Sequence, residues 1–171
     1  MSAQPQPLPQ KPASKVEFPW DSTAVRAPQV VATMASYLDQ LAVSSRPGTV
    51  EAYELTLRQF AGQLVEHDPT CRSVAQIQRR HIEHYKLWMR QRRRPGGAAL
   101  SAKTIRHKLG LVRVFFERII EWGYHDAPDR VPIFPGDLPV VDEPLPKFLD
   151  DAAAAKLMAA LANEPDPRRR L

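Results

Sequence analysis

The positions of the prolines restrict long helices to the central part of this chain. The chain has 171 residues, and most of its seventeen prolines lie in two clusters, one before residue 29 and one after residue 127. A proline inside a helix removes a backbone hydrogen bond and clashes with the preceding turn. Long helices are therefore restricted to the stretch between the clusters, about 95 residues, which is enough for one modest hydrophobic core.

Within this stretch the apolar residues recur at the three-to-four-residue spacing of an amphipathic helix. Thr49 and Ser101 are expected to cap two of the helices with their hydroxyl groups, and Gly123 suits the position just after a helix end. No strand pattern is evident, so the predicted fold class is all-α, a four-helix bundle. The four helices are predicted at about residues 29–43, 49–67, 78–93 and 101–122.

The segments outside the bundle are predicted from composition. Residues 1–28 contain six prolines and few apolar residues, so we expect a flexible tail. Residues 126–148 contain six more prolines and no helical pattern, so we expect a linker. A last helix is predicted over residues 152–162.

Positive charge is concentrated in one segment of the chain. The whole chain carries 24 basic and 19 acidic residues, a net charge of +5. Residues 72–118 hold thirteen basic residues and only two acidic ones, Glu83 and Glu117, so this segment has a net charge of +11. Because so few acids lie nearby, we expect an open positive surface rather than a set of ion pairs. Such a surface favours a polyanionic partner, most commonly nucleic acid.

The cations gather on two predicted helices and the loop between them. On a helical wheel, one flank of the third helix and one flank of the fourth are basic, and Pro95-Gly96-Gly97 breaks the chain between them. A phosphate backbone needs long cationic side chains on rigid supports, and hydroxyl and N–H groups at a helix start add donors. The candidate DNA-binding residues in this segment are Arg79, Lys86, Arg90, Arg92, Arg93, Arg94, Ser101, Lys103, Thr104, Arg106 and Arg113.

No catalytic or metal site is predicted from the residues. His81 and His84 are three residues apart, but a closed zinc site needs four ligands, and we expect them to contact solvent or phosphate. Cys71 is the single cysteine, which excludes an intramolecular disulfide and suits a reducing, cytoplasmic setting. Tyr37 and Tyr85 lie on core faces and are expected to pack. With no phosphate-binding glycine loop and no stretch long enough to span a membrane, we expect no cofactor, small-molecule substrate or membrane association.

Three motifs follow one another along the chain. The first runs Tyr37-Leu38 … Leu41 … Ser44 … Thr49 … Tyr53 … Leu57 … Phe60. The second runs Ser101-Ala-Lys-Thr-Ile-Arg … Leu109 … Leu111-Val-Arg-Val-Phe-Phe … Trp122-Gly123, and the third runs Pro144-Leu-Pro-Lys-Phe-Leu-Asp-Asp … Lys156-Leu-Met-Ala-Ala-Leu. Together they resemble the core-binding, SAM-like domain and the entry to the catalytic domain of the tyrosine recombinases, the family of phage integrases and Xer-type recombinases.

This resemblance implies that residues 29–125 form the core-binding domain and that residues 149–171 begin a catalytic domain. Members of the family cut and rejoin DNA through a 3′-phosphotyrosyl intermediate without ATP or a required metal, and their two domains clamp the duplex. The family's catalytic Arg, Lys, His-x-x-Arg, His or Trp, and Tyr all lie in the catalytic domain. Arg168, Arg169 and Arg170 stand before the position of the first, so we expect no catalytic residue in this chain.

The resemblance also indicates which elements meet the partner, double-stranded DNA. In the family these are the starts of the second and fourth helices, here Arg46, Thr49, Lys103, Thr104, Arg106 and His107. Other recombinase protomers on the same DNA are further expected partners. The alternative hypothesis is a helical protein–protein interaction module whose basic face meets an acidic partner.

Overall fold

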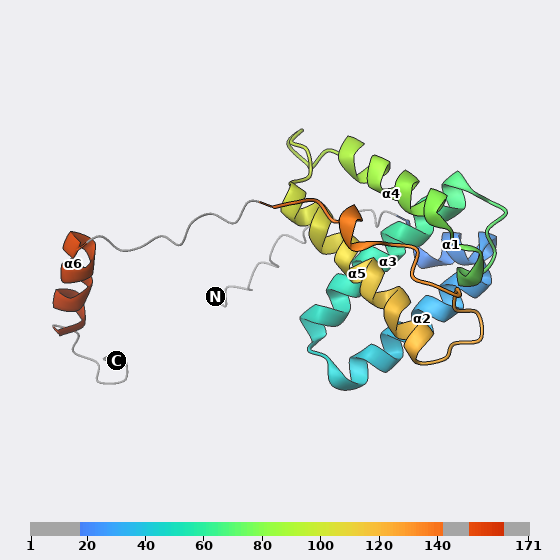
Figure 1. Ribbon diagram of the computed structural model, residues 1–171, viewed down its shortest axis with the longest axis horizontal. Helices are drawn as coiled ribbons and strands as arrows, with labels where there is room; N and C mark the ends of the chain where they lie inside the picture. Colours follow the sequence, from blue (N-terminus) through green and yellow to red (C-terminus); the bar gives the residue numbers. More distant parts are fainter. Residues whose placement is uncertain (1–17, 142–150, 163–171) are drawn as a thin grey trace, which may run out of the picture. The chain divides into compact units, whose positions relative to one another are not determined.

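The helices of the first unit are arranged around one long central helix. A computed structural model describes residues 18–141 and 151–162. The chain divides into two units after Val140. The elements are α1 (Trp20–Arg26), α2 (Pro28–Ser44), α3 (Pro47–His67), the 3₁₀ turn η1 (Val74–Gln76), α4 (Arg79–Gln91), α5 (Ala102–Glu121), the 3₁₀ turn η2 (Pro135–Asp137) and α6 (Asp151–Ala162) (Figure 1). Within the described ranges the sole pairing of extended backbone is a bridge between Arg93 and Ala99, which confirms the all-α prediction.

The central helix is α3, which contacts α1, α2, α4 and α5 (Figure 1). Its Phe60 lies between Tyr85 of α4 and Phe116 of α5, with ring centroids 5.1 and 6.2 Å away in edge-to-face contact. Tyr37 of α2 meets Phe115 of α5 in the same geometry at 5.0 Å. Aromatic rings prefer this arrangement because the positive edge of one faces the negative face of the other. The predicted core faces are therefore confirmed.

The boundaries of the four helices predicted for the bundle agree with the sequence to within about two residues, and the expected cap differs only at the start of α3. The Ser101 hydroxyl accepts a hydrogen bond from the Thr104 N–H at 3.2 Å, and Gly123 ends α5 with a positive φ of 70°, as predicted. The expected Thr49 cap is wrong: α3 begins at Pro47, with Arg46 as the N-cap residue and no side-chain cap. Proline suits the first helical position because its φ is already helical and its missing N–H would have no partner there.

The end of the predicted tail is helical. Residues 1–17 lie outside the described residues, but α1 occupies Trp20–Arg26 and Pro28 begins α2. Trp20 donates its Nε1–H to Glu54 of α3 at 2.9 Å, and Phe18 lies against Gly62, where a Cβ atom would come within 2.4 Å of the ring. The tail prediction is wrong here because Pro19 and Pro28 stand where helices begin, a position that tolerates proline.

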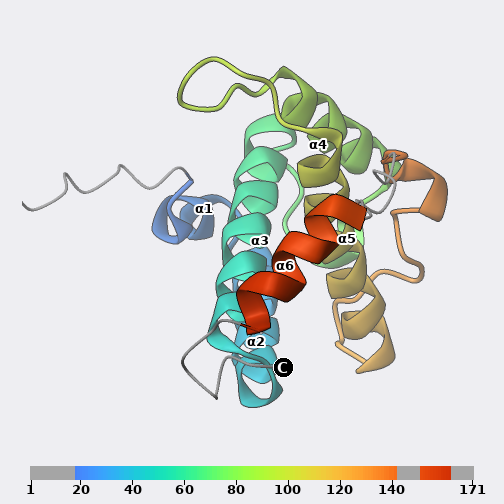
Figure 2. The ribbon, with the colours of Figure 1, turned by 90° about the vertical axis from the view of Figure 1, so that its left-hand side faces the viewer.

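The first half of the predicted linker packs on the bundle. After α5 the chain turns back and runs along that helix toward its start (Figures 1 and 2). We call residues 127–140 the return segment; Ile133 is 2% exposed and Asp137 is 8% exposed. The linker prediction is wrong for this segment because prolines exclude a helix but still allow an extended chain to bury the apolar residues between them. Residues 142–150 lie outside the described residues.

The second unit contains α6, at the position predicted for the last helix. Its Met158 is 67% exposed. None of the described helices is both long enough and apolar enough to cross a membrane.

Candidate nucleic-acid interface

The loop between α4 and α5 is a short hairpin rather than a flexible connection. Arg94 donates its backbone N–H to Ala98 at 2.8 Å and accepts from Gly97 at 2.9 Å. Pro95 and Gly96 occupy the two central positions of this turn, and Gly96 has a φ of 114°. That combination is typical of a type II turn, in which only the third residue needs a positive φ and glycine adopts it without strain. The turn therefore holds the end of α4 next to the start of α5.

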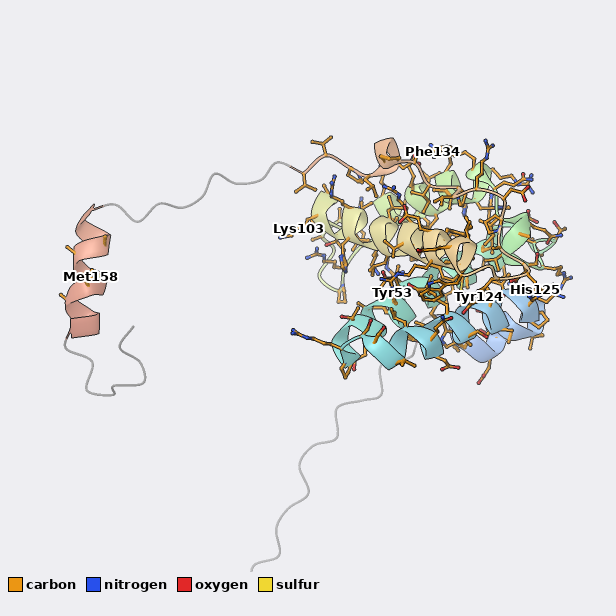
Figure 3. All side chains as sticks on the ribbon, turned by 60° about the horizontal axis from the view of Figure 1, so that its bottom comes forward. Tyr53, Lys103, Tyr124, His125, Phe134 and Met158 are labelled. Atoms are coloured by element: carbon orange, nitrogen blue, oxygen red, sulfur yellow. The ribbon has the colours of Figure 1, made fainter. Side chains whose placement is uncertain are left out.

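This hairpin gathers exposed cations from both helices. We call the basic loop surface the side chains of Arg90, Arg93, Arg94, Lys103 and Arg106. All five are exposed, and no carboxylate within residues 18–141 and 151–162 forms an ion pair with any of them. Figure 3 shows Lys103 at the outer end of α5. This part of the predicted positive surface is therefore open.

Hydrogen-bond donors at the start of α5 adjoin these cations. Arg94 Nη2 donates to Thr104 Oγ1 at 3.3 Å, and the hydroxyl groups of Ser101 and Thr104 lie 2.8 Å apart. His107 is exposed one turn further along α5. Arg92 lies with its guanidinium 4.8 Å from the centre of the Trp88 ring, a cation–π contact that holds it against α4.

The first half of α4 is electrostatically different, because its cations are paired. Arg79 and Lys86 both contact the carboxylate of Asp137 in the return segment, and both also contact Glu83. Hydrogen bonds from Arg79, then from the Phe134 N–H and Lys86, hold the pKa of Asp137 well below its usual range. Two carboxylates thus neutralise these two cations, for which the sequence predicted an open surface.

Two other cations of the segment are paired as well. Arg113 Nε lies 2.8 Å from Glu117, and Arg80 lies 3.2 Å from Asp68. The expectation of open positive charge is therefore wrong for Arg79, Arg80, Lys86 and Arg113. Asp68 and Asp137 lie outside residues 72–118, and only the fold brings them to these cations.

The start of α3 stands apart from the basic loop surface. Arg46 and Thr49 are exposed, but the start of α3 and the α4–α5 hairpin lie at opposite ends of the bundle in both Figure 1 and Figure 2. The structure thus brings together the candidate residues of the hairpin and of α5, and leaves these two at a separate location.

The histidines of α4 are occupied by protein contacts. His81 is 3% exposed, accepts the Gln78 N–H at its Nδ1, and lies with Nε2 3.0 Å from Asp68. The His84 ring stacks on His67 with centroids 3.5 Å apart. The expected contact of His81 with solvent or phosphate is therefore wrong, since the ring is buried and contacts Asp68, the residue just after α3. Over the described part of the chain, no three His, Cys, Asp or Glu residues are grouped to hold a metal ion.

Two residues with roles near the interface were missed by the sequence interpretation. Lys108 donates to the buried amide oxygen of Gln59 at 2.7 Å and so joins α5 to α3. Asp137 was treated as part of a linker. An aspartate directly after a Pro-Gly pair does not by itself indicate an ion pair. Gln59 could have been detected, because it is a polar residue on the apolar side of α3.

One comparison with known proteins gave a match. A model of the phage integrase N-terminal SAM-like domain matches residues 34–126, more than half of the chain. The match begins within α2, extends just past the end of α5 and contains the whole basic loop surface. Searches of curated proteins and of solved structures gave no match.

Proposed function

We propose that this chain, which belongs to the phage integrase N-terminal SAM-like domain family, binds double-stranded DNA through the basic loop surface. The observation that carries the proposal is the group of five exposed cations without a carboxylate partner at the end of α4, in the α4–α5 hairpin and at the start of α5. Their supports are rigid: a helix end, a hydrogen-bonded turn and a capped helix start. Cations held in this way can follow the phosphates of a duplex without the cost of ordering a flexible loop on binding.

The roles of the candidate residues follow from their positions. Arg90, Arg93 and Arg94 are proposed to contact phosphate groups, because they are exposed at the end of α4 and in the hairpin that follows it. Lys103, Thr104, Arg106 and His107 occupy the first two turns of α5, and this helix start is the element proposed to approach the groove. Arg46 and Thr49 would contact a different stretch of the same duplex. A helix entering the major groove can present such side chains to base edges.

The chemistry of recombination is proposed to lie outside the described residues. Tyr124, just after α5, donates its hydroxyl to Gln40 at 3.0 Å, and burial raises its pKa, so it is a poor nucleophile in this arrangement. Incubation with a nicked suicide substrate is expected to give no covalent protein–DNA adduct. An adduct that survives denaturing electrophoresis would overturn this part of the proposal.

Binding is tested by fluorescence anisotropy with the full chain and a labelled 30-base-pair duplex at several salt concentrations. Five phosphate contacts predict that log affinity falls against log salt with a slope of about −4.5. A slope near zero would remove the electrostatic basis of the proposal. Poly-glutamate at equal charge concentration is the second ligand: if it binds and the duplex does not, the basic surface serves an acidic protein partner instead.

A further inference from the structure

We propose that Asp137 is an internal competitor of DNA phosphate, and that DNA binding draws Arg79 and Lys86 away from it and releases residues 134–139 from α4. The inference rests on the proposed function, because it describes how that same interface is regulated. We call the contacts of Asp137 with Arg79 and Lys86 the Asp137 clasp.

The clasp has the geometry of a phosphate contact. Arg79 directs both terminal nitrogens at the two carboxylate oxygens, and its Nη2 lies 2.5 Å from Oδ1. Lys86 Nζ lies 3.0 Å from the same Oδ1, and the Phe134 N–H donates to Oδ2 at 2.7 Å. An arginine fork with a neighbouring lysine binds a carboxylate or a phosphate in the same way, because both present two coplanar oxygens. Asp137 therefore occupies a position that suits a DNA phosphate.

The clasp borders directly on the basic loop surface. Lys86 and Arg90 are four residues apart on α4, so they lie on the same face of the helix. On the other side, Arg106 Nη1 donates to the backbone oxygen of Pro139, at 3.0 Å. The return segment thus contacts two cations of α4 and, through Pro139, one cation of the basic loop surface. A duplex bound to that surface would approach the edge of the segment.

The part of the return segment that would move is held by the Asp137 clasp, by a contact of the Phe134 ring with Arg79, and by Leu138, which is partly buried against the core. Ile133 is buried and anchors the segment from within the core, whereas Phe134, Pro135 and Gly136 are exposed. Figure 3 shows Phe134 at the surface. Release of residues 134–139 would therefore separate Leu138 from the core while Ile133 stays in place. DNA binding and release of the segment are thermodynamically linked. If DNA binding favours release by some factor, release increases the affinity for DNA by the same factor.

The first experiment compares Asp137→Asn with Asp129→Asn by the anisotropy titration above. Asp129 is an exposed acid of the same segment, so its replacement removes the same formal charge without touching the clasp. Asp137→Asn is expected to bind the duplex about tenfold tighter at 0.1 M salt, with a slope steeper by about 1 to 2, since one or two further phosphates gain partners. Asp129→Asn is expected to match the wild type.

The outcomes separate this inference from the proposed function. If the wild type binds DNA and Asp137→Asn binds equally or more weakly with an unchanged slope, the clasp is structural and the inference fails while the function stands. If neither protein binds DNA, both fail. If only Asp137→Asn binds, the clasp masks the interface completely, which supports the inference.

A second measurement needs no variant, in case Asp137→Asn does not fold. The N–H groups of Asp137 and Leu138 donate to Phe134 and Pro135 within η2, so their hydrogen exchange reports on the segment. Adding duplex to the wild type is expected to speed exchange at these two amides while α4 becomes protected. Unchanged or slower exchange at both amides would overturn the inference.

Discussion

Removing three cations of the basic loop surface should weaken DNA binding most at low salt. The affinity of the variant should therefore depend less on salt than that of the wild type. The change is Arg93→Gln, Arg94→Gln and Lys103→Gln together, which leaves Arg90 and Arg106 in place. With five phosphate contacts, raising salt from 50 to 200 mM lowers the affinity of the wild type about 500-fold, from a slope of about −4.5. With two contacts the slope is about −1.8 and the same change costs only about 12-fold. The assay is the anisotropy titration repeated at each salt concentration.

The control removes the same charge elsewhere. Arg26→Gln, Arg130→Gln and Lys156→Gln replace three exposed cations that lie outside the basic loop surface, so the net charge falls equally. This control is expected to keep a slope close to that of the wild type. Thermal unfolding of both triple variants should stay near the wild type, because substitutions at exposed surface positions usually change stability by less than about 0.5 kcal/mol. Equal slopes for the two triple variants would refute the localisation of the interface, since the net charge of the chain would then decide the binding.

Three further predictions concern the fold. Gly62→Ala places a Cβ within 2.4 Å of Phe18 and should be less stable by about 1–3 kcal/mol than Gly110→Ala, which meets no atom within 4 Å; chemical denaturation measures both, and equal stabilities would contradict the docking of Phe18. Because hydrogen bonds from Arg79, then Phe134 and Lys86, lower the pKa of Asp137, its stabilisation is complete above about pH 4 and is lost as the pH falls further, since the unfolded chain takes up the proton first. Asp137→Asn should therefore flatten the loss of stability between about pH 4 and pH 2 in acid titrations. Burial raises the pKa of Cys71 to about 11, so iodoacetamide at pH 8 should label it only after denaturation; rapid labelling of the native chain would contradict its burial.

The elements of the bundle were predictable because their signals are local. Apolar residues at helical spacing placed Tyr37, Phe60 and Tyr85 in the core, and each of them is buried. The Ser101 cap and the Gly123 terminus depend on single residues whose hydrogen bonding or φ preference is the same in any fold. The Pro-Gly-Gly break likewise predicted a turn, and the chain makes one there.

The errors at both ends share a cause, because proline reports on the backbone and not on packing. The prolines of residues 1–28 and of the return segment predicted neither long helices nor contact with the bundle. Trp20 and Ile133 nevertheless bury apolar surface against the core of the bundle. Whether a proline-rich segment docks depends on the complementary surface, which no local pattern encodes.

The sequence alone determined how much positive charge the chain holds and on which segment. The tertiary structure decided how that charge is distributed between open surface and ion pairs. Arg79 and Lys86 lie 58 and 51 residues from Asp137 in the chain, and only the return of the chain along α5 brings that carboxylate to them. Charge within a segment is a sum over its residues, but an electrostatic surface depends on distances between atoms, and folding sets those distances.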